Sequence, residues 1–153
     1  MTTNLTKTAV AAVLSLAIAT PVMAGNPAVK ARQSLMQLYK FNIAQLGGMA
    51  KGKIPYDAKV ASVAANNLKT LATVDQAAMW PAGTDSDAMF GDTRALPAIW
   101  ATYPEVEQKA DALIKATEAM AAAAGTDLES LRGAMGGLGG ACGGCHKKFR
   151  APE

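Results

Sequence analysis

The stretch 126–150, TDLESLRGAMGGLGGACGGCHKKFR, decides the fold of the chain. Its apolar residues recur at alternating gaps of three and four, which places them on one face of a helix that packs into a core. Thr126 and Glu129 have the spacing of a capping box, so we expect the helix to begin there. The apolar stripe consists of Leu128, Leu131, Met135, Leu138, Cys142, Cys145 and Phe149.

The same helix is unusually rich in glycine. Seven of the fourteen glycines of the chain lie between Gly133 and Gly144. Each glycine costs about 0.5–1 kcal/mol relative to alanine inside a helix. We therefore expect that another group orders this helix or approaches its backbone closely.

Three further amphipathic segments precede this helix. The first starts at Asn26 as N-cap with Pro27 at the first helical position, and it ends near Ala50. The second follows Asp57, and the third begins between Pro97 and Pro104 and ends at Gly125. Their expected apolar stripes are Met36, Tyr39, Ile43, Leu46 and Ala50; Val60, Val63, Ala64, Leu68, Leu71 and Val74; and Val106, Ala110, Leu113, Thr117, Met120 and Ala124.

The connections between these segments indicate how they are arranged. Two links are short, and one irregular segment, about 80–96, is long enough to cross between distant helix ends. No stretch alternates strictly between apolar and polar residues, so we expect no sheet. The sequence predicts an all-α fold, an antiparallel up-down four-helix bundle.

The composition and the first residues indicate an exported single domain. The chain has 153 residues, 50% hydrophobic but 5% aromatic, and a net charge of +3, which is too mild for a nucleic-acid surface. Residues 1–24 contain Lys7, the apolar run Ala9–Ala19 and the cleavage sequence Val22-Met23-Ala24, which together predict a secretory signal peptide. The run is too short to span a bilayer. We expect residues 25–153 to fold in a bacterial periplasm without membrane insertion.

The residues Cys142-Gly143-Gly144-Cys145-His146 form a CxxCH motif, which is typical of c-type haem attachment. Thiols three residues apart share one helix face, so both reach the vinyl groups of one porphyrin. His146 then stands beneath the iron as its proximal ligand. We expect one covalent haem c, attached through Cys142 and Cys145, which would also supply the aromatic bulk that the sequence lacks.

Three other interpretations of the motif are weaker. A thioredoxin-type dithiol needs the two cysteines at a helix start beside a βαβ unit, and neither is present. A zinc site needs four ligands, whereas the chain has two cysteines and one histidine. A structural disulfide across two residues of one helix would stabilise little.

The second axial position decides what the iron can do. With one histidine in the chain, ligation by two histidines is excluded within a protomer. Met36 lies near the start of the first helix, which an antiparallel bundle places beside the end of the fourth, and Met79 is the second candidate. Met49 and Met135 lie about 20 Å and 16 Å from this level at 1.5 Å per residue. Met120 belongs to the opposite end.

This combination of leader, four helices and C-terminal CxxCH resembles the cytochrome c′ (cytochrome c prime) family, the class II c-type cytochromes. Other stretches match the family as well: ARQSLM at 31–36, Lys51-Gly52, Pro55-Tyr56-Asp57, Pro97-Ala98-Ile99-Trp100 and CGGCHKKFR at 142–150. The resemblance extends over residues 26–150. One position of the first helix, here Met36, separates the two branches of the family.

The resemblance implies specific roles. A methionine at the position of Met36 implies a six-coordinate, low-spin iron, as in cytochrome c-556, and a one-electron carrier rather than an enzyme. The alternative is a five-coordinate, high-spin cytochrome c′ that binds nitric oxide or carbon monoxide. Arg32 is expected to contact a haem propionate, and Arg150 to lie beside the proximal imidazole. Redox proteins are the expected partners, and a homodimer through the first two helices is a further expectation.

Overall fold

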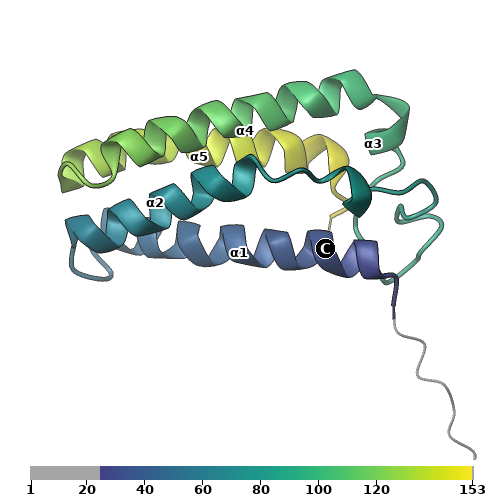
Figure 1. Ribbon diagram of the computed structural model, residues 1–153, viewed down its shortest axis with the longest axis horizontal. Helices are drawn as coiled ribbons and strands as arrows, with labels where there is room; N and C mark the ends of the chain where they lie inside the picture. Colours follow the sequence, from purple (N-terminus) through teal and green to yellow (C-terminus); the bar gives the residue numbers. More distant parts are fainter. Residues whose placement is uncertain (1–24, 153) are drawn as a thin grey trace, which may run out of the picture.

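The computed structural model describes residues 25–152, which form the predicted all-α bundle (Figure 1). Four long helices run antiparallel to their neighbours in sequence: α1 (Pro27–Ala50), α2 (Ala58–Ala72), α4 (Tyr103–Ala123) and α5 (Leu128–Phe149). A 3₁₀ turn, η1 (Ala77–Met79), and a short helix, α3 (Ala98–Ala101), lie between α2 and α4. The predicted signal peptide, residues 1–24, lies outside the described residues.

The helix starts follow their capping residues, with one correction. The Asn26 side chain accepts hydrogen bonds from the Ala28 and Val29 amides, and Asp57 accepts one from the Val60 amide, as predicted. The capping box at Thr126 is wrong. Asp127 has extended backbone and accepts a hydrogen bond from the Ser130 amide at 2.7 Å, because the Thr126 amide is still bonded to the last turn of α4.

The third predicted helix is divided in two, and each of its two prolines opens one piece. Pro97 precedes α3, and Pro104 occupies the first turn of α4, where a proline leaves no additional donor unpaired. At the other end of the bundle, Gly52 follows α1 with a φ of +68°, which a glycine adopts without strain.

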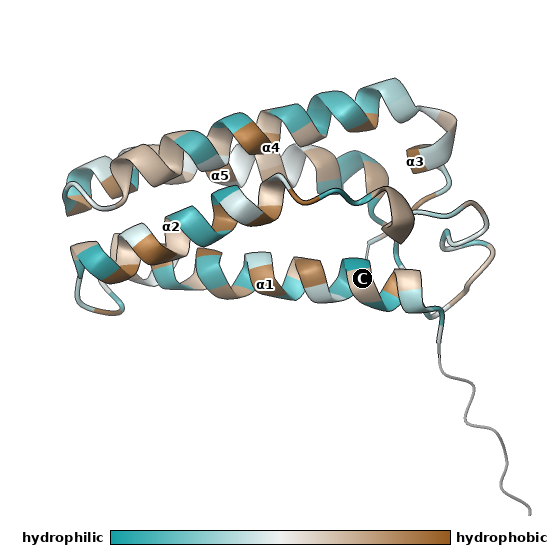
Figure 2. Ribbon diagram, in the orientation of Figure 1, coloured by the Kyte–Doolittle hydropathy of each residue, from teal (hydrophilic) through white to brown (hydrophobic). Residues whose placement is uncertain are grey.

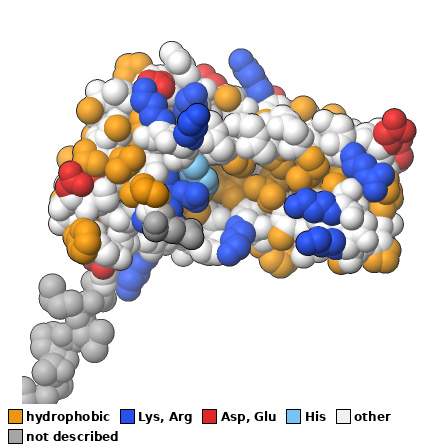
Figure 3. Space-filling view, turned by 180° about the vertical axis from the view of Figure 1, so that it is seen from behind, with side chains coloured by type: hydrophobic (Ala, Val, Ile, Leu, Met, Phe, Trp, Pro, Cys, Tyr) orange, Lys and Arg blue, Asp and Glu red, His pale blue; other side chains and the backbone are white. Residues whose placement is uncertain are grey.

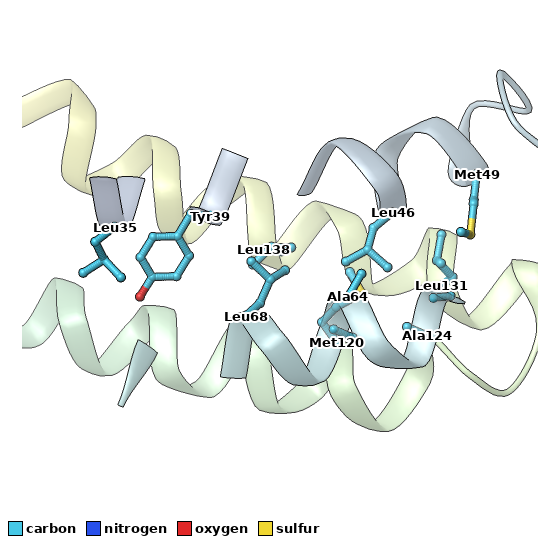
Figure 4. Close-up of a cluster of buried hydrophobic side chains, with 12 residues drawn as sticks. Leu35, Tyr39, Leu46, Met49, Ala64, Leu68, Met120, Ala124, Leu131 and Leu138 are labelled. Carbon is cyan, nitrogen blue, oxygen red and sulfur yellow. The ribbon is translucent and has the colours of Figure 1, made fainter. Parts of the chain in front are cut away.

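The main core lies between the four long helices, and its side chains point toward one another (Figure 4). The predicted stripes of α4 and α5 are confirmed where burial is greatest, at Thr117, Met120, Leu131 and Leu138. The members of the main core are Leu35, Tyr39, Leu46, Met49, Ala61, Ala64, Ala65, Leu68, Met120, Ala124, Leu131 and Leu138.

Two predicted stripes need correction. Helix α1 turns Leu35 rather than Met36 into the main core, and Met36 is 37% exposed. Helix α2 buries alanines, which allow close packing, while Val60 and Val63 remain exposed. Figure 2 shows hydrophobic segments in brown along α1 and α2, and several of the apolar residues on these two helices are exposed at the surface.

A second, smaller core lies at the end of the bundle where the crossover meets α5. It consists of Ala95, Ile99 and Phe149, with Trp80 and Trp100 packed against them. An isolated antiparallel bridge joins Ala95 to Arg150, and no strand occurs among residues 25–152. Within the same residues, no helix has the length and hydropathy needed to cross a membrane.

Candidate haem site

The two thiols lie where the two cores meet. Cys142 packs against the main core and Cys145 against the second, and both side chains are partly buried. Burial raises the pKa of both thiols, an effect that Lys109 opposes at Cys145. Two sulfurs on one helix face, each beside apolar side chains, are the arrangement that double attachment of a flat apolar ring requires.

His146 follows directly and faces an open cavity of about 470 Å³. Figure 3 shows the single histidine in a hollow of the surface, beside blue basic side chains and a seam of hydrophobic ones. Burial lowers the pKa of His146, and the positive charges of Arg150 and Arg94 lower it further. These effects favour the neutral imidazole, which is the form that binds a metal. The cavity is lined by Arg94, Gly143, His146, Lys147, Arg150, Ala151 and Pro152.

Met36 lies on the first part of α1, which occupies the same end of the bundle as the last turns of α5 (Figure 1). The neighbouring Leu35 and Tyr39 are buried, whereas Met36 belongs to neither core. The other methionines weighed as ligands are placed differently. Met79 packs against the main core, and Met49 and Met120 are buried within it.

The Tyr39 hydroxyl provides a test of whether a haem fits this site. It is buried and has no hydrogen-bond partner, and burial together with Cys142 raises the pKa of Tyr39 to about 12. An unsatisfied buried hydroxyl costs about 1–3 kcal/mol. This hydroxyl beside the first thiol and the two partly buried sulfurs fit a large cofactor with both apolar and polar atoms, while the cavity at His146 borders neither cysteine nor Tyr39.

Arg32 is buried, with 3% of its surface exposed. Its Nη1 donates hydrogen bonds to Thr84 Oγ1 at 2.8 Å and to the Met79 carbonyl at 3.2 Å. Its Nη2 donates to Thr93 Oγ1 at 3.0 Å and to the Thr84 carbonyl. The Arg32 side chain is therefore not solvated, although an arginine on an amphipathic helix commonly is. The propionate contact stays a prediction.

The crossover residues that enclose Arg32 and border His146 were not predicted from the sequence. Trp80 and Trp100 stack against the guanidinium, and Arg94 donates two hydrogen bonds to the Ala151 carbonyl near His146. One signal was available, because both tryptophans of a chain with 5% aromatic residues flank the crossover.

The glycines of α5 do not approach any other part of the protein. A Cβ added at six of the seven would meet nothing within 4 Å, and at Gly144 only the end of Lys109 at 4.0 Å. No protein side chain uses the space beside these glycines, and close approach of the haem to this helix stays a prediction. Most of these glycines lie on the exposed side of the helix, away from the buried Leu131, Leu138 and Phe149.

Comparisons with known proteins agree on one relationship. The family described as cytochrome c′ matches residues 27–150. The chain is 45% identical to a cytochrome c-554 of Cereibacter sphaeroides, over 82% of this chain and 93% of that one. It is 35% identical to a cytochrome c′ of the same species, over 80% and 81% of the two chains. A solved cytochrome c′ from Rhodobacter sphaeroides has a TM-score of 0.80 and 36% identity, over 82% and 96% of the chains.

Proposed function

The chain belongs to the cytochrome c′ family, whose members carry covalent haem c, and we propose that it is a periplasmic monohaem electron carrier. Cys142 and Cys145 hold the haem, His146 ligates the iron on one face and Met36 on the other. When bound, the haem supplies a metal that exchanges one electron with partner proteins. The observation that carries the proposal is Met36, a thioether outside both cores on the part of α1 that shares one end of the bundle with the last turns of α5.

His–Met ligation favours this function for a physical reason. A neutral thioether stabilises reduced iron and so raises the reduction potential relative to other axial ligands. Two protein ligands also leave no open position for a gas or for oxygen. Burial and the neighbouring arginines lower the pKa of His146 and so favour the neutral imidazole, which is the form that binds a metal.

A second candidate function is supported by the exposure of Met36. Its side chain is 37% exposed and belongs to no core, so little packing opposes its displacement. A five-coordinate iron that binds nitric oxide or carbon monoxide would follow if the thioether were away from the metal. The relatives include proteins named cytochrome c′ as well as cytochrome c-554.

The test compares the variants Met36→Leu and Met79→Leu, which make the same change at the two candidate thioethers. In the reduced wild-type protein we expect sharp low-spin bands that carbon monoxide does not shift. Met36→Leu should give a high-spin spectrum that carbon monoxide does shift, and Met79→Leu should match the wild type. A low-spin Met36→Leu protein that binds no carbon monoxide would refute the ligand assignment.

The proposed partners follow from two surfaces. Lys147 and Arg150 are exposed beside His146 and suit a redox protein with an acidic docking surface. On α1 and α2, Leu38, Phe41, Val60 and Val63 are between 45% and 62% exposed. Exposed apolar side chains on two helices that pack together suit a contact surface, and we propose that they form a homodimer interface.

The leader sequence supports the proposed periplasmic location. Residues 1–24 have the pattern of a secretory signal peptide, and the bundle begins directly after them with the Asn26 cap. Export of the chain with loss of the leader is therefore part of the proposal. Mass spectrometry of the mature protein tests it, since cleavage after Ala24 leaves Gly25 as the first residue.

A further inference from the structure

Arg32 is the only charged side chain that is buried in the part of the chain that the structure describes. Every hydrogen bond recorded for its guanidinium goes to a neutral oxygen: two threonine hydroxyls and two backbone carbonyls. Within residues 25–152, no carboxylate forms an ion pair with it. Asp85 acts on its charge without bonding to it, because the Asp85 carboxylate is partly buried and accepts hydrogen bonds from the Asp87 and Ala88 amides instead.

Two aromatic rings complete the surroundings of the charge. The guanidinium carbon lies 4.7 Å from the centre of the Trp80 ring and 5.9 Å from that of Trp100. Trp100 Nε1 in turn donates a hydrogen bond to the Trp80 carbonyl at 3.0 Å, which fixes the two rings relative to each other. An arginine stays protonated even when burial lowers its pKa. The residues that bond to or stack on the guanidinium are Met79, Thr84, Thr93, Trp80 and Trp100, and we call them the Arg32 cage. This cage encloses a full positive charge with neutral groups.

The cage is fixed at the end of the bundle that carries the haem motif. Arg32 lies one helical turn before Met36 on α1. It binds Thr93, and the residues that follow Thr93 pair with the end of α5: Leu96 donates to the Phe149 carbonyl at 3.0 Å and Ala151 to the Arg94 carbonyl at 2.8 Å. The charge thus has a fixed place between the first helix and the residues just after His146.

We propose that the buried charge of Arg32 raises the reduction potential of the haem, an inference that rests on the proposed function. One electron arrives from a reduced partner protein, and no bond or proton moves. The added electron makes the haem less positive, so a nearby fixed cation stabilises the reduced form. Buried charges are screened far less than exposed ones, and the hydrogen bonds of Arg32 prevent it from turning into water.

The experiment uses the haem-loaded protein and a control on the same helix. Arg32 lies four residues before Met36 and Lys40 four residues after it, so the two cations are matched in sequence distance, whereas Lys40 is exposed. We compare Arg32→Gln, Arg32→Lys and Lys40→Gln by redox titration of the visible spectrum and by urea unfolding. The reduction potential of the haem is expected to fall when the charge at position 32 is removed. The free energy of unfolding is expected to fall when hydrogen bonds of that side chain are removed.

Arg32→Gln should shift the oxidised-to-reduced ratio at a fixed potential about tenfold toward the oxidised form, which is about 59 mV for one electron. Arg32→Lys should keep most of the potential but unfold at a lower urea concentration. Lys40→Gln should change the ratio less than about twofold, and salt should abolish that small effect. Equal shifts for Arg32→Gln and Lys40→Gln would overturn the proposal.

If Arg32→Gln does not accumulate, Thr93→Val replaces it. That variant keeps the charge and removes one acceptor of Arg32, so we expect an unchanged potential and a lower stability. A fall in potential for both Thr93→Val and Arg32→Lys would contradict the proposal, because neither removes the charge. If Met36 does not ligate the iron, the visible spectra will show it. The reduction potentials of the Arg32 and Lys40 variants can still be compared in that case, so the proposal for Met36 and the proposal for Arg32 fail separately.

Discussion

Gly125 and Ser62 are so close that a Cβ added to Gly125 would lie 3.1 Å from the Ser62 Cβ. The contact joins the turn after α4 to helix α2, and the Ala58 carbonyl is also within 3.5 Å of the added atom. An added methyl group would therefore press on the Ser62 side chain, and the turn or Ser62 would have to shift by a few tenths of an ångström. The glycines of α5, by contrast, have open space around them, so the same substitution should have opposite effects at the two places.

Gly125→Ala should therefore destabilise the protein by about 1–3 kcal/mol, since the turn must move to accept the methyl group. Gly140→Ala should stabilise it by about 0.5–1 kcal/mol through helix propensity alone. Urea unfolding of the loaded protein measures both. Destabilisation by Gly140→Ala would show that the exposed face of α5 is covered by another group in solution.

Covalent attachment is tested by removing the sulfurs. The double variant Cys142→Ala, Cys145→Ala should lose its colour on a denaturing gel stained for haem, because no thioether remains. The control is Gly143→Ala, which adds a methyl group between the two cysteines where nothing lies within 4 Å. The Gly143→Ala protein should stain as strongly as the wild type. If it does not stain, haem attachment requires a residue without a side chain between the two cysteines.

The apolar surface of α1 and α2 predicts an oligomeric state. Phe41→Glu and Val63→Glu should each convert a dimer into a monomer in analytical ultracentrifugation, because a desolvated carboxylate cannot be accommodated between apolar faces. Phe90 is 95% exposed on the crossover, and Phe90→Glu serves as the control that should leave the dimer intact. Dissociation by all three variants would indicate that added charge alone separates the subunits.

Acid should weaken the start of α5. Hydrogen bonds from Ser130 hold the pKa of Asp127 below its ordinary value of 3.8. A carboxylate with a lowered pKa in the folded protein stabilises it above the unfolded value, and this contribution is lost as the pH falls through the folded value. The melting temperature of the wild type should therefore fall more between pH 6 and pH 3 than that of Asp127→Asn, which still caps the helix without titrating. Asp111→Asn, in the middle of α4, is the control expected to follow the wild type.

The long helices were predictable because local signals determine them. Asn26 and Asp57 cap the helices that the sequence assigns to them, and the stripe of α5 gives its buried face. The buried faces of α1 and α2 were less predictable. A stripe of valines and a stripe of alanines both satisfy the helical period on α2, and only tertiary packing selects the alanines, which allow the helices closer together.

Some residues of the candidate site could likewise be predicted from local sequence, and others could not. CxxCH is a contiguous motif, so haem-binding roles for Cys142, Cys145 and His146 could be proposed from the sequence, and these roles stay predictions. The surroundings of Arg32 could not be predicted, because Thr84, Thr93 and Trp80 lie in irregular parts of the crossover, whose path no periodicity describes, and Trp100 lies in the four-residue helix α3. Asp127 illustrates a smaller limit: two adjacent residues were both able to cap, and the length of the preceding turn decided between them.

The glycine-rich helix α5 has a consequence for quality control in the cell. Its exposed face contributes little intrinsic helix propensity, so the helix depends on what its opposite face contacts. A chain that has not received its prosthetic group lacks part of those contacts and should open this segment more often. Local opening is what proteases recognise. Limited proteolysis should therefore cut this segment faster in haem-free than in haem-loaded protein.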